Sequence, residues 1–295
     1  MHIPVLQKEV LQYLDPKPNE NFIDGTLGYG GHTISILEKT GPGGKVLGIE
    51  KDAEMIKNVS GRKEIKNFKN RLILENNSFV NLKEIVEKNK FKSVSGILLD
   101  LGMSSWHVDS SKKGFSFLKN EPLDMRYSEL NPLTAEKILN YWSQQELEKI
   151  IKEYGEERFS QSISRKIVDA RKIKKIETTG QLVDIIRQGI SSSAAHQKIH
   201  FATRTFQALR IAVNDELNSI TRVLPQALEI LNKGGKLAVI SFHSLEDRIV
   251  KNFNKDSNQK QLATILTKKP IIATLEEVKE NPRSRSAKLR VISKI

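Results

Sequence analysis

Asn21-Phe-Ile-Asp-Gly-Thr-Leu-Gly-Tyr-Gly-Gly-His32 is the stretch that decides the fold. An apolar run ends in Asp24, and a glycine-rich turn then leads into Thr33-Ile-Ser-Ile-Leu37, which is typical of a helix. A strand, a glycine loop and a helix start, in this order, form the unit that holds nucleotide-like cofactors. The stretch therefore predicts a site for an adenosine-containing cofactor in the N-terminal part of the chain.

A second strand follows about twenty residues later. It is Lys45-Val-Leu-Gly-Ile49, and it ends in Glu50-Lys51-Asp52. A carboxylate at this spacing is the group that binds a ribose diol. Glu50 is therefore predicted to hold the ribose of the cofactor.

The glycine spacing favours S-adenosylmethionine over a nicotinamide cofactor. In G-x-G-x-x-G loops the third glycine lets the helix pack close to the strand. Here Gly28 and Gly30 fit, but Thr33 stands at the third place. A pyrophosphate needs free N–H groups at a helix start, whereas S-adenosylmethionine has no phosphate and needs close backbone approach. A tight turn without a ligand is the alternative, and Glu50 argues against it. The residues that suit S-adenosylmethionine are Asp24, Gly28, Gly30, Gly31 and Glu50.

The composition is that of a globular protein. Of 295 residues, 38% are hydrophobic and 28% are charged. No apolar run approaches the roughly 20 residues that span a bilayer, and Met1–Glu9 lacks the apolar core of a signal peptide. We therefore expect the cytoplasm and no membrane partner. Cysteine is absent, which excludes disulfides and also methylation of pyrimidine C5 through a cysteine adduct. None of the histidines has the spacing of a metal site, and we expect no metal.

The net charge of +13 indicates a polyanionic partner such as RNA. A generally basic surface is the alternative. Two clusters stand out, Arg283, Arg285, Lys288 and Arg290 in one and Lys166, Arg171, Lys172, Lys174 and Lys175 in the other.

Strands and helices alternate in the first hundred residues. Short apolar segments predict strands near 21–27, 45–50, 71–75 and 96–101, with helices near 31–40, 52–59 and 80–88. From about 110 to 200 the pattern is helical, with capping boxes at Ser143 and Thr178. The prediction is an α/β domain formed by 1–108 and 202–295, interrupted by an inserted helical domain at 109–201.

Ser191-Ser-Ser-Ala-Ala195 is expected to be a flexible crossing out of the inserted domain. A long amphipathic helix is then expected from Phe206 to Leu224, where Pro225 breaks or restarts it. Gly234-Gly235 is expected to end the next helix, before a buried strand at 236–241.

Three segments carry groups that could act in chemistry. Asp100-Leu-Gly-Met-Ser-Ser-Trp-His107 follows a central strand, where ligands of parallel sheets bind; its serines could instead cap a helix while Trp106 packs. Asp124 either pairs with Arg126 structurally or lines the substrate entrance. His243 follows the late strand and either binds substrate or is structural. Near Phe206, Arg204 and Arg210 either bind nucleic acid or flank a core aromatic.

Taken together, these motifs resemble the RsmH (MraW) family of bacterial ribosomal RNA small-subunit methyltransferases over essentially the whole chain. The resemblance rests on His2–Leu6, Asp24–His32, Asp100–Ser105, Gly114–Phe117, Leu123–Arg126, Ala202–Glu216, Val239–Val250 and Asn281–Arg290. It implies a Rossmann-like class I methyltransferase fold with an inserted all-helical domain. It also implies methylation of the exocyclic N4 of a cytidine in the decoding region of 16S rRNA, with S-adenosylmethionine as methyl donor.

Carried over by position, the family's cofactor contacts fall on Gly30, Gly31, His32, Glu50, Phe79, Asp100 and His107. Two positions depart from the commoner pattern of the family. Glu50 stands where Asp is usual, and His107 stands where Gln is usual. Neither change removes a needed charge, so the resemblance still implies activity.

The chemistry of a cytosine amine suggests how the reaction proceeds. An acceptor for the amine N–H is expected to assist attack on the methyl group. Asp100 is the predicted acceptor, with a role in cofactor binding alone as the alternative, and Asp124 and His243 are further catalytic candidates. The target base must leave its stack, and Phe79, Trp106 or Phe242 could stack on it. The expected partner is 16S rRNA in the 30S subunit or a late assembly intermediate. The sequence leaves the oligomeric state open, a homodimer included.

Two other classes compete with this interpretation. A cofactor-binding RNA chaperone would bind RNA without methyl transfer. A methyltransferase for small molecules or proteins would not need the net charge of +13, and its rate would depend weakly on salt.

Overall fold

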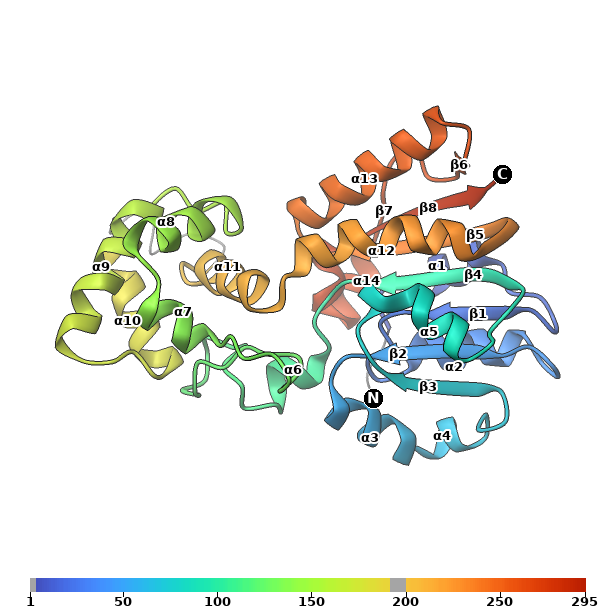
Figure 1. The fold of residues 1–295 in the computed structure, drawn as a ribbon, viewed down its shortest axis with the longest axis horizontal. Coiled ribbons are helices and arrows are strands. Elements are labelled where there is room, and N and C mark those ends of the chain that lie inside the picture. Colours follow the sequence, from blue (N-terminus) through green and yellow to red (C-terminus); the bar gives the residue numbers. More distant parts are fainter. Residues whose placement is uncertain (1–3, 192–199) are drawn as a thin grey trace. The chain divides into compact units, whose positions relative to one another are not determined.

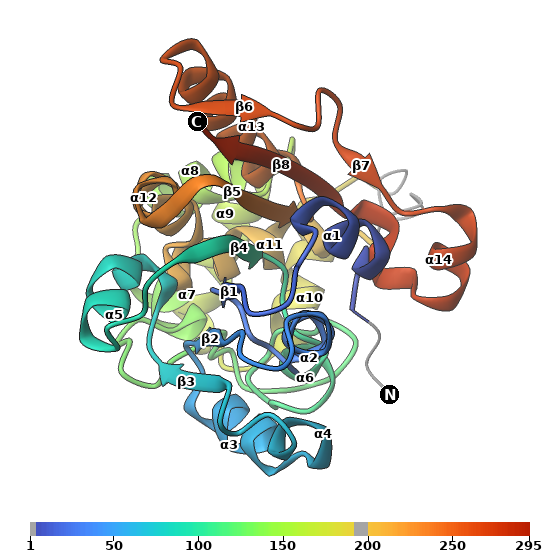
Figure 2. The ribbon, with the colours of Figure 1, turned by 90° about the vertical axis from the view of Figure 1, so that its right-hand side faces the viewer.

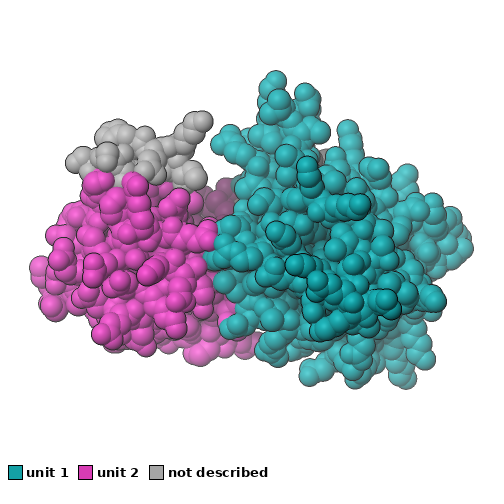
Figure 3. Space-filling model, turned by 90° about the horizontal axis from the view of Figure 1, so that it is seen from above, with its two compact units in different colours: residues 1–102, 217–295 teal, residues 103–216 magenta. Residues whose placement is uncertain are grey.

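The computed structural model describes residues 4–191 and 200–295, which divide into two compact units (Figure 3). Unit 1 consists of residues 1–102 and 217–295, and unit 2 of residues 103–216. The predicted boundaries at 109 and 201 both lie inside unit 2. Residues 192–195 of the expected crossing and His2-Ile3 of the first family motif lie outside the described residues.

Unit 1 is built on one sheet (Figure 1). Within the described residues the sheet has eight strands: β1 Asn21–Asp24, β2 Val46–Glu50, β3 Leu72–Asn76, β4 Val94–Asp100, β5 Leu231–Ser241, β6 Ala263–Ile265, β7 Ile271–Ile272 and β8 Lys288–Lys294. The order is β3-β2-β1-β4-β5-β8-β6, and β7 pairs with β8. The first five strands are parallel, whereas β8 runs antiparallel to β5, β6 and β7.

The strand order places the ligand edge of the sheet. The chain leaves β1 toward β2 on one side and returns as β4 on the other, so the order reverses between β1 and β4. Ligands of open parallel sheets bind beyond the carboxyl ends of the strands at such a reversal. Asp24, Glu50 and Asp100 are the last residues of β1, β2 and β4. The predicted carboxylates therefore meet at one edge.

Helices cover both faces of the sheet. Figure 2 shows α5 and α12 on one face and α1 and α2 on the other. The helices of unit 1 are α1 Gln7–Leu14, α2 Gly31–Lys39, α3 Ala53–Gly61, α4 Lys63–Lys66, η1 Phe79–Asn81, α5 Leu82–Lys88, α12 Glu216–Ile230, α13 Ser244–Gln259, α14 Leu275–Glu280 and η3 Pro282–Ser286. On the α5 side, Leu82 and Leu224 pack with strand residues such as Ile97, and all three are at most 1% exposed. Each such side chain contributes about 1.5–3 kcal/mol when buried.

Unit 2 is helical at its centre. Its helices are α6 Ser105–Asp109, α7 Ala135–Tyr141, α8 Gln144–Glu153, α9 Ser160–Ile173, α10 Thr179–Gly189 and α11 Thr203–Asn214. Both predicted capping boxes are present, Ser143 with Glu146 and Thr178 with Gln181. The helices share their own core, to which Leu139, Ile151, Ile167, Leu182, Phe206 and Leu209 belong. In the described part of the chain, no helix is long and apolar enough to cross a membrane.

Four local predictions are wrong. Residues 111–134 contain no helix, because two prolines and Gly114 at φ 75° are incompatible with one. The long amphipathic helix ends at Asn214, where Asp215 adopts φ 51°, and aspartate tolerates this left-handed conformation. Pro225 lies inside α12 and does not end it, since apolar neighbours on the helix pack into the core. Gly234 belongs to β5 rather than to a helix end.

Candidate functional site

The glycine loop after β1 requires its glycines. Gly28 and Gly30 have φ of 48° and 74°, a region that side chains rarely adopt. Gly30 is the N-cap of α2, and Gly31 is its first residue. A Cβ on Gly31 would lie 2.4 Å from Cγ of Pro4. Pro4 therefore packs directly on the backbone of the loop, and a side chain at position 31 would not fit there.

Glu50 holds this loop against the next strand. Its Oε2 accepts the backbone N–H of Gly28 at 3.0 Å, and its Oε1 accepts that of Asp52 at 3.0 Å. Asp52 in turn caps α3 by accepting the N–H of Glu54 at 2.9 Å. Each carboxylate oxygen has a second lone pair, which a ribose hydroxyl can use.

Asp24 is the innermost carboxylate of the site, with 1% of its surface exposed. Its Oδ2 accepts the hydroxyl of Thr33 at 2.7 Å, and its Oδ1 accepts the N–H of Thr26 at 3.1 Å. Burial, together with the charge of Glu50, outweighs these hydrogen bonds and raises the pKa of Asp24 to about 6.

Asp100 lies at the end of β4 with its backbone N–H bonded to Oγ1 of Thr26 at 2.6 Å. Its Oδ2 is 4.0 Å from Nε2 of His32, a buried side chain at the start of α2. Burial first, and then the charges of Asp24 and Glu246, raise the pKa of Asp100 to about 7. The N–H of Gly102 has the opposite effect on this pKa and is outweighed. The site therefore concentrates negative charge that a cationic ligand would relieve.

These groups fit S-adenosylmethionine. Oδ1 of Asp100 is buried and accepts no hydrogen bond from the described residues, and such an atom calls for a partner. The cofactor carries a cationic sulfonium, an ammonium and a ribose diol. The carboxylates of Asp24, Glu50 and Asp100 complement these groups, and the glycine loop supplies the close backbone approach.

Phe79 follows β3 and begins η1. Its Cβ would lie 3.6 Å from a Cβ on Gly25, and its ring packs partly buried against the core on the α5 side. The structure thus gathers six of the seven expected cofactor residues in unit 1: Gly30, Gly31, His32, Glu50, Phe79 and Asp100. The seventh, His107, belongs to unit 2.

His107 is buried in an aromatic cluster of unit 2. Its ring lies 5.3, 5.2 and 4.9 Å from those of Trp106, Phe115 and Tyr127. Its Nδ1 is 3.1 Å from Oγ of Ser104. A cofactor contact by His107 stays a prediction from the family resemblance.

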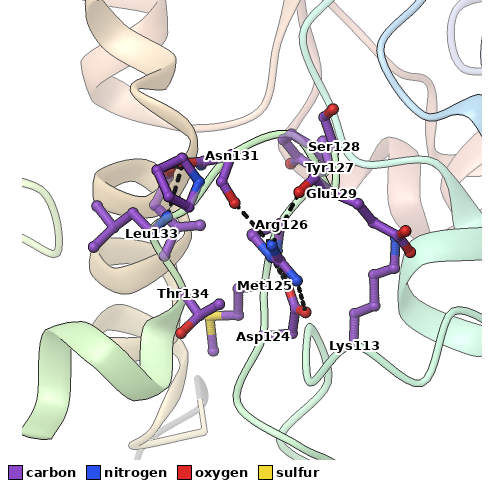
Figure 4. A network of polar contacts seen from close by, with 12 residues as sticks. Lys113, Asp124, Met125, Arg126, Tyr127, Ser128, Glu129, Asn131, Leu133 and Thr134 are labelled. Carbon is purple, nitrogen blue, oxygen red and sulfur yellow. Dashed lines mark hydrogen bonds and ion pairs between the residues drawn. The ribbon is translucent and has the colours of Figure 1, made fainter.

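Asp124 forms a two-pronged ion pair with Arg126 (Figure 4). Nε and Nη2 of Arg126 donate to the two carboxylate oxygens at 2.8 Å each. Nη1 of Arg126 donates to the carbonyls of Glu129 and Asn131. Although burial opposes it, this pairing lowers the pKa of Asp124. Of the two roles considered for Asp124, the geometry supports the structural one, because both oxygens are engaged.

His243 is the N-cap of α13 and shares a capping box with Glu246. Nδ1 of His243 accepts the N–H of Glu246 at 3.4 Å, and its Nε2 lies 3.2 Å from Oε1 of Glu246. Histidine is an unusual cap, so the sequence did not single out Glu246. Glu246 is 1% exposed, and its charge raises the pKa of the Asp100 carboxyl. It is a residue of the site that the sequence interpretation missed.

Part of the basic C-terminal cluster is neutralised internally. Arg290 is 8% exposed and pairs with both oxygens of Asp247 at 2.6 and 3.2 Å. Lys288 lies 3.7 Å from the same carboxylate. Lys288 and Arg290 are therefore tied to the fold, while Arg283 and Arg285 of the same cluster lie in η3.

Comparison with known proteins agrees with this geometry. A model of the MraW methylase family matches residues 1–295. Ribosomal RNA small subunit methyltransferase H of Acetivibrio thermocellus is 46% identical over 309 residues, covering 100% of this chain and 99% of that protein. The protein of the same name from a Sulfurihydrogenibium species is 46% identical over 290 residues, covering 98% of each.

The fold has a counterpart among solved structures. A crystal structure of a protein described as an rRNA-methylase from Clostridium thermocellum has a TM-score of 0.51 and 14% identity, and covers 100% of both chains. Together with the strand order, it confirms the predicted Rossmann-like methyltransferase fold. The family match over the whole length and the 46% identity to methyltransferase H show that the chain belongs to the MraW methylase family.

Proposed function

We propose that this protein transfers a methyl group from S-adenosylmethionine to the exocyclic N4 of a cytidine in the decoding region of 16S rRNA. The observation that carries the proposal is the set of carboxylates at the ends of β1, β2 and β4, in a chain 46% identical to ribosomal RNA small subunit methyltransferase H. The proposed substrate is the 30S subunit or a late assembly intermediate, and the proposed compartment is the cytoplasm.

The loops of unit 1 hold the cofactor in this proposal. Glu50 accepts the ribose hydroxyls while the N–H groups of Gly28 and Asp52 fix its carboxylate. The backbone at Gly30 and Gly31 and the ring of His32 border the methionine part, and Phe79 borders the adenine. When bound, S-adenosylmethionine supplies an electrophilic methyl group. A cofactor contact by His107, which the family resemblance implies, is part of this proposal.

Asp100 is the group that we propose to act on the amine. The lone pair of a cytosine N4 is delocalised into the ring, so the amine is a poor nucleophile. An acceptor on its N–H localises the lone pair, and the same acceptor can take the proton as the new bond forms. A pKa of about 7 suits that transfer near neutral pH. Asp124 and His243 suit it less, because Arg126 and Glu246 occupy their polar atoms.

Unit 2 is proposed to recognise the RNA around the target. It carries exposed basic residues, among them Lys172, Lys174, Arg187 and Arg204. Phosphate contacts position a protein on nucleic acid, and base contacts specify the sequence. The net charge of +13 supports such a partner.

The test is transfer of labelled methyl from S-adenosylmethionine to 30S subunits of a strain that lacks this gene, followed by nucleoside analysis. We expect the label in N4-methylcytidine. Binding of S-adenosylmethionine without label in RNA would overturn the substrate while leaving the cofactor site. Binding of 30S subunits without any methyl transfer would instead indicate an RNA chaperone.

A further inference from the structure

The ring of Phe242 lies directly on the backbone of Gly102. A Cβ on Gly102 would lie 2.4, 2.8 and 2.9 Å from Cε2, Cδ2 and Cζ of the ring. The two residues meet because β5 pairs with β4 up to the strand ends, where the N–H of Leu101 donates to the carbonyl of Ile240. Phe242 is the first residue after β5 and is half-buried.

Gly102 also connects this ring to the Asp100 carboxylate. It lies two residues after Asp100, the last residue of β4, and its N–H lowers the pKa of the Asp100 carboxyl. Gly102 thus lies close to Asp100 in the chain and has the aromatic ring against its Cα. The ring of Phe242 and the Asp100 carboxylate therefore both lie at the ends of two paired strands, β5 and β4.

The position of Phe242 is fixed from behind. Its N–H donates to Oε2 of buried Glu246 at 2.7 Å, the same oxygen that accepts the N–H of His243 in the capping box of α13. The backbone that carries the ring is therefore fixed by a hydrogen bond to a charged group. Such a bond is stronger than one between neutral groups. The Phe242 ring therefore loses little conformational freedom when a ligand binds to it.

We propose that Phe242 is the surface on which the extruded target cytosine stacks, with its N4 amine directed at Asp100. This inference rests on the function proposed above. Enzymes that act on a base take it out of its stack and hold it against apolar or aromatic side chains. Phe79 lies near Gly25, on the β1 side of the sheet edge, and packs into the core. Trp106 is only 7% exposed and belongs to the aromatic cluster of unit 2.

The test compares Phe242→Leu and Phe242→Tyr with the full-length protein, using 30S subunits as substrate. Loss of one aromatic stack should lower kcat/KM for 30S subunits by about 10- to 100-fold in Phe242→Leu. Phe242→Tyr keeps the ring and should stay near the wild-type value. The Kd for S-adenosylmethionine should change by less than about threefold in both, since Phe242 stacks on the base and not on the cofactor. Phe253→Leu is the matched control, because Phe253 lies on α13 and packs against the core.

Two outcomes would overturn the inference: wild-type kcat/KM in Phe242→Leu, or a loss confined to S-adenosylmethionine affinity. A wild-type protein that labels no RNA would instead refute the proposed function itself. If Phe242→Leu does not fold, photo-crosslinking of the wild-type protein decides. With 5-bromocytidine at the methylated position, we expect the cross-linked peptide to contain Phe242. A cross-link only to a peptide from another strand end would overturn the assignment.

Discussion

The backbone N–H of Gly28 donates a 3.0 Å hydrogen bond to Oε2 of Glu50, although 22 residues separate them in the chain. This bond joins the glycine loop after β1 to the end of β2. The same carboxylate accepts the N–H of Asp52, which caps α3. Glu50 therefore organises the site before any ligand binds, and its extra methylene relative to aspartate is used to reach the loop.

Glu50 gives the first prediction. Glu50→Gln removes the charge from the ribose acceptor and should weaken S-adenosylmethionine binding by about 10- to 100-fold, as for loss of a hydrogen bond to a charged group. Glu50→Asp keeps the charge but is too short for the Gly28 N–H. Its affinity for S-adenosylmethionine should therefore lie between those of the wild type and Glu50→Gln. Isothermal titration calorimetry measures both. Equal affinity in all three proteins would show that Glu50 does not contact the cofactor.

Asp100→Asn should abolish methyl transfer and still bind S-adenosylmethionine. It should also stabilise the unliganded protein. Because the folded pKa of about 7 lies above the ordinary value of 3.8, the carboxyl's favourable contribution is fully present below pH 3.8 and is lost as the pH rises from there through about 7. The whole shift corresponds to about 4 kcal/mol. Since the side chain is 25% exposed, we expect a gain of about 2 kcal/mol at pH 8 and a smaller one at pH 5.

Urea unfolding at the two pH values measures this gain, and transfer of labelled methyl measures the activity. A mutant with wild-type turnover would remove Asp100 from the mechanism. A mutant without any gain in stability at pH 8 would show that the carboxylate is not strained in the unliganded site.

The sequence predicted the parallel part of the sheet well. The segments at β1 to β4 are short apolar runs bounded by turns, and this local pattern is visible in any such chain. The prediction of helices failed between residues 111 and 134, where hydrogen bonds to distant residues replace regular secondary structure. Asn131, for example, donates to the carbonyl of Val213 at the end of α11. Contacts between residues 82 apart leave no periodic signal in either segment.

The site was predictable where motif and strand end coincide, as at Glu50 and Asp100. It was not predictable where tertiary burial sets the role of a residue. Glu246 reads as an ordinary helix residue, yet its carboxylate is 1% exposed and raises the pKa of Asp100. Asp124 was a further catalytic candidate after Asp100, and only the position of Arg126 shows that its oxygens are engaged.

The pH dependence follows from Asp100 and Glu246. If ionised Asp100 accepts the amine N–H, kcat/KM should rise with pH through about 7. Glu246→Gln removes one charge that raises this pKa, while its amide oxygen can still accept the N–H of Phe242. The midpoint should therefore move to lower pH. Glu229→Gln, at an exposed ion pair with Lys83, is the control and should leave the midpoint in place. An unmoved midpoint in Glu246→Gln would contradict the role given to Asp100.

The ion pair of unit 2 gives the last prediction. Asp124→Asn leaves Arg126, itself 21% exposed, without its carboxylate, and should lower the free energy of unfolding by about 2 kcal/mol. A double-mutant cycle with Arg126→Gln should give a coupling of about 1–2 kcal/mol. Asp169→Asn is the control, because Asp169 and its partner Lys172 are 58% and 69% exposed, and such pairs contribute little. Methyl transfer by folded Asp124→Asn should stay within a few-fold of wild type; a loss comparable to that of Asp100→Asn would return Asp124 to the catalytic residues.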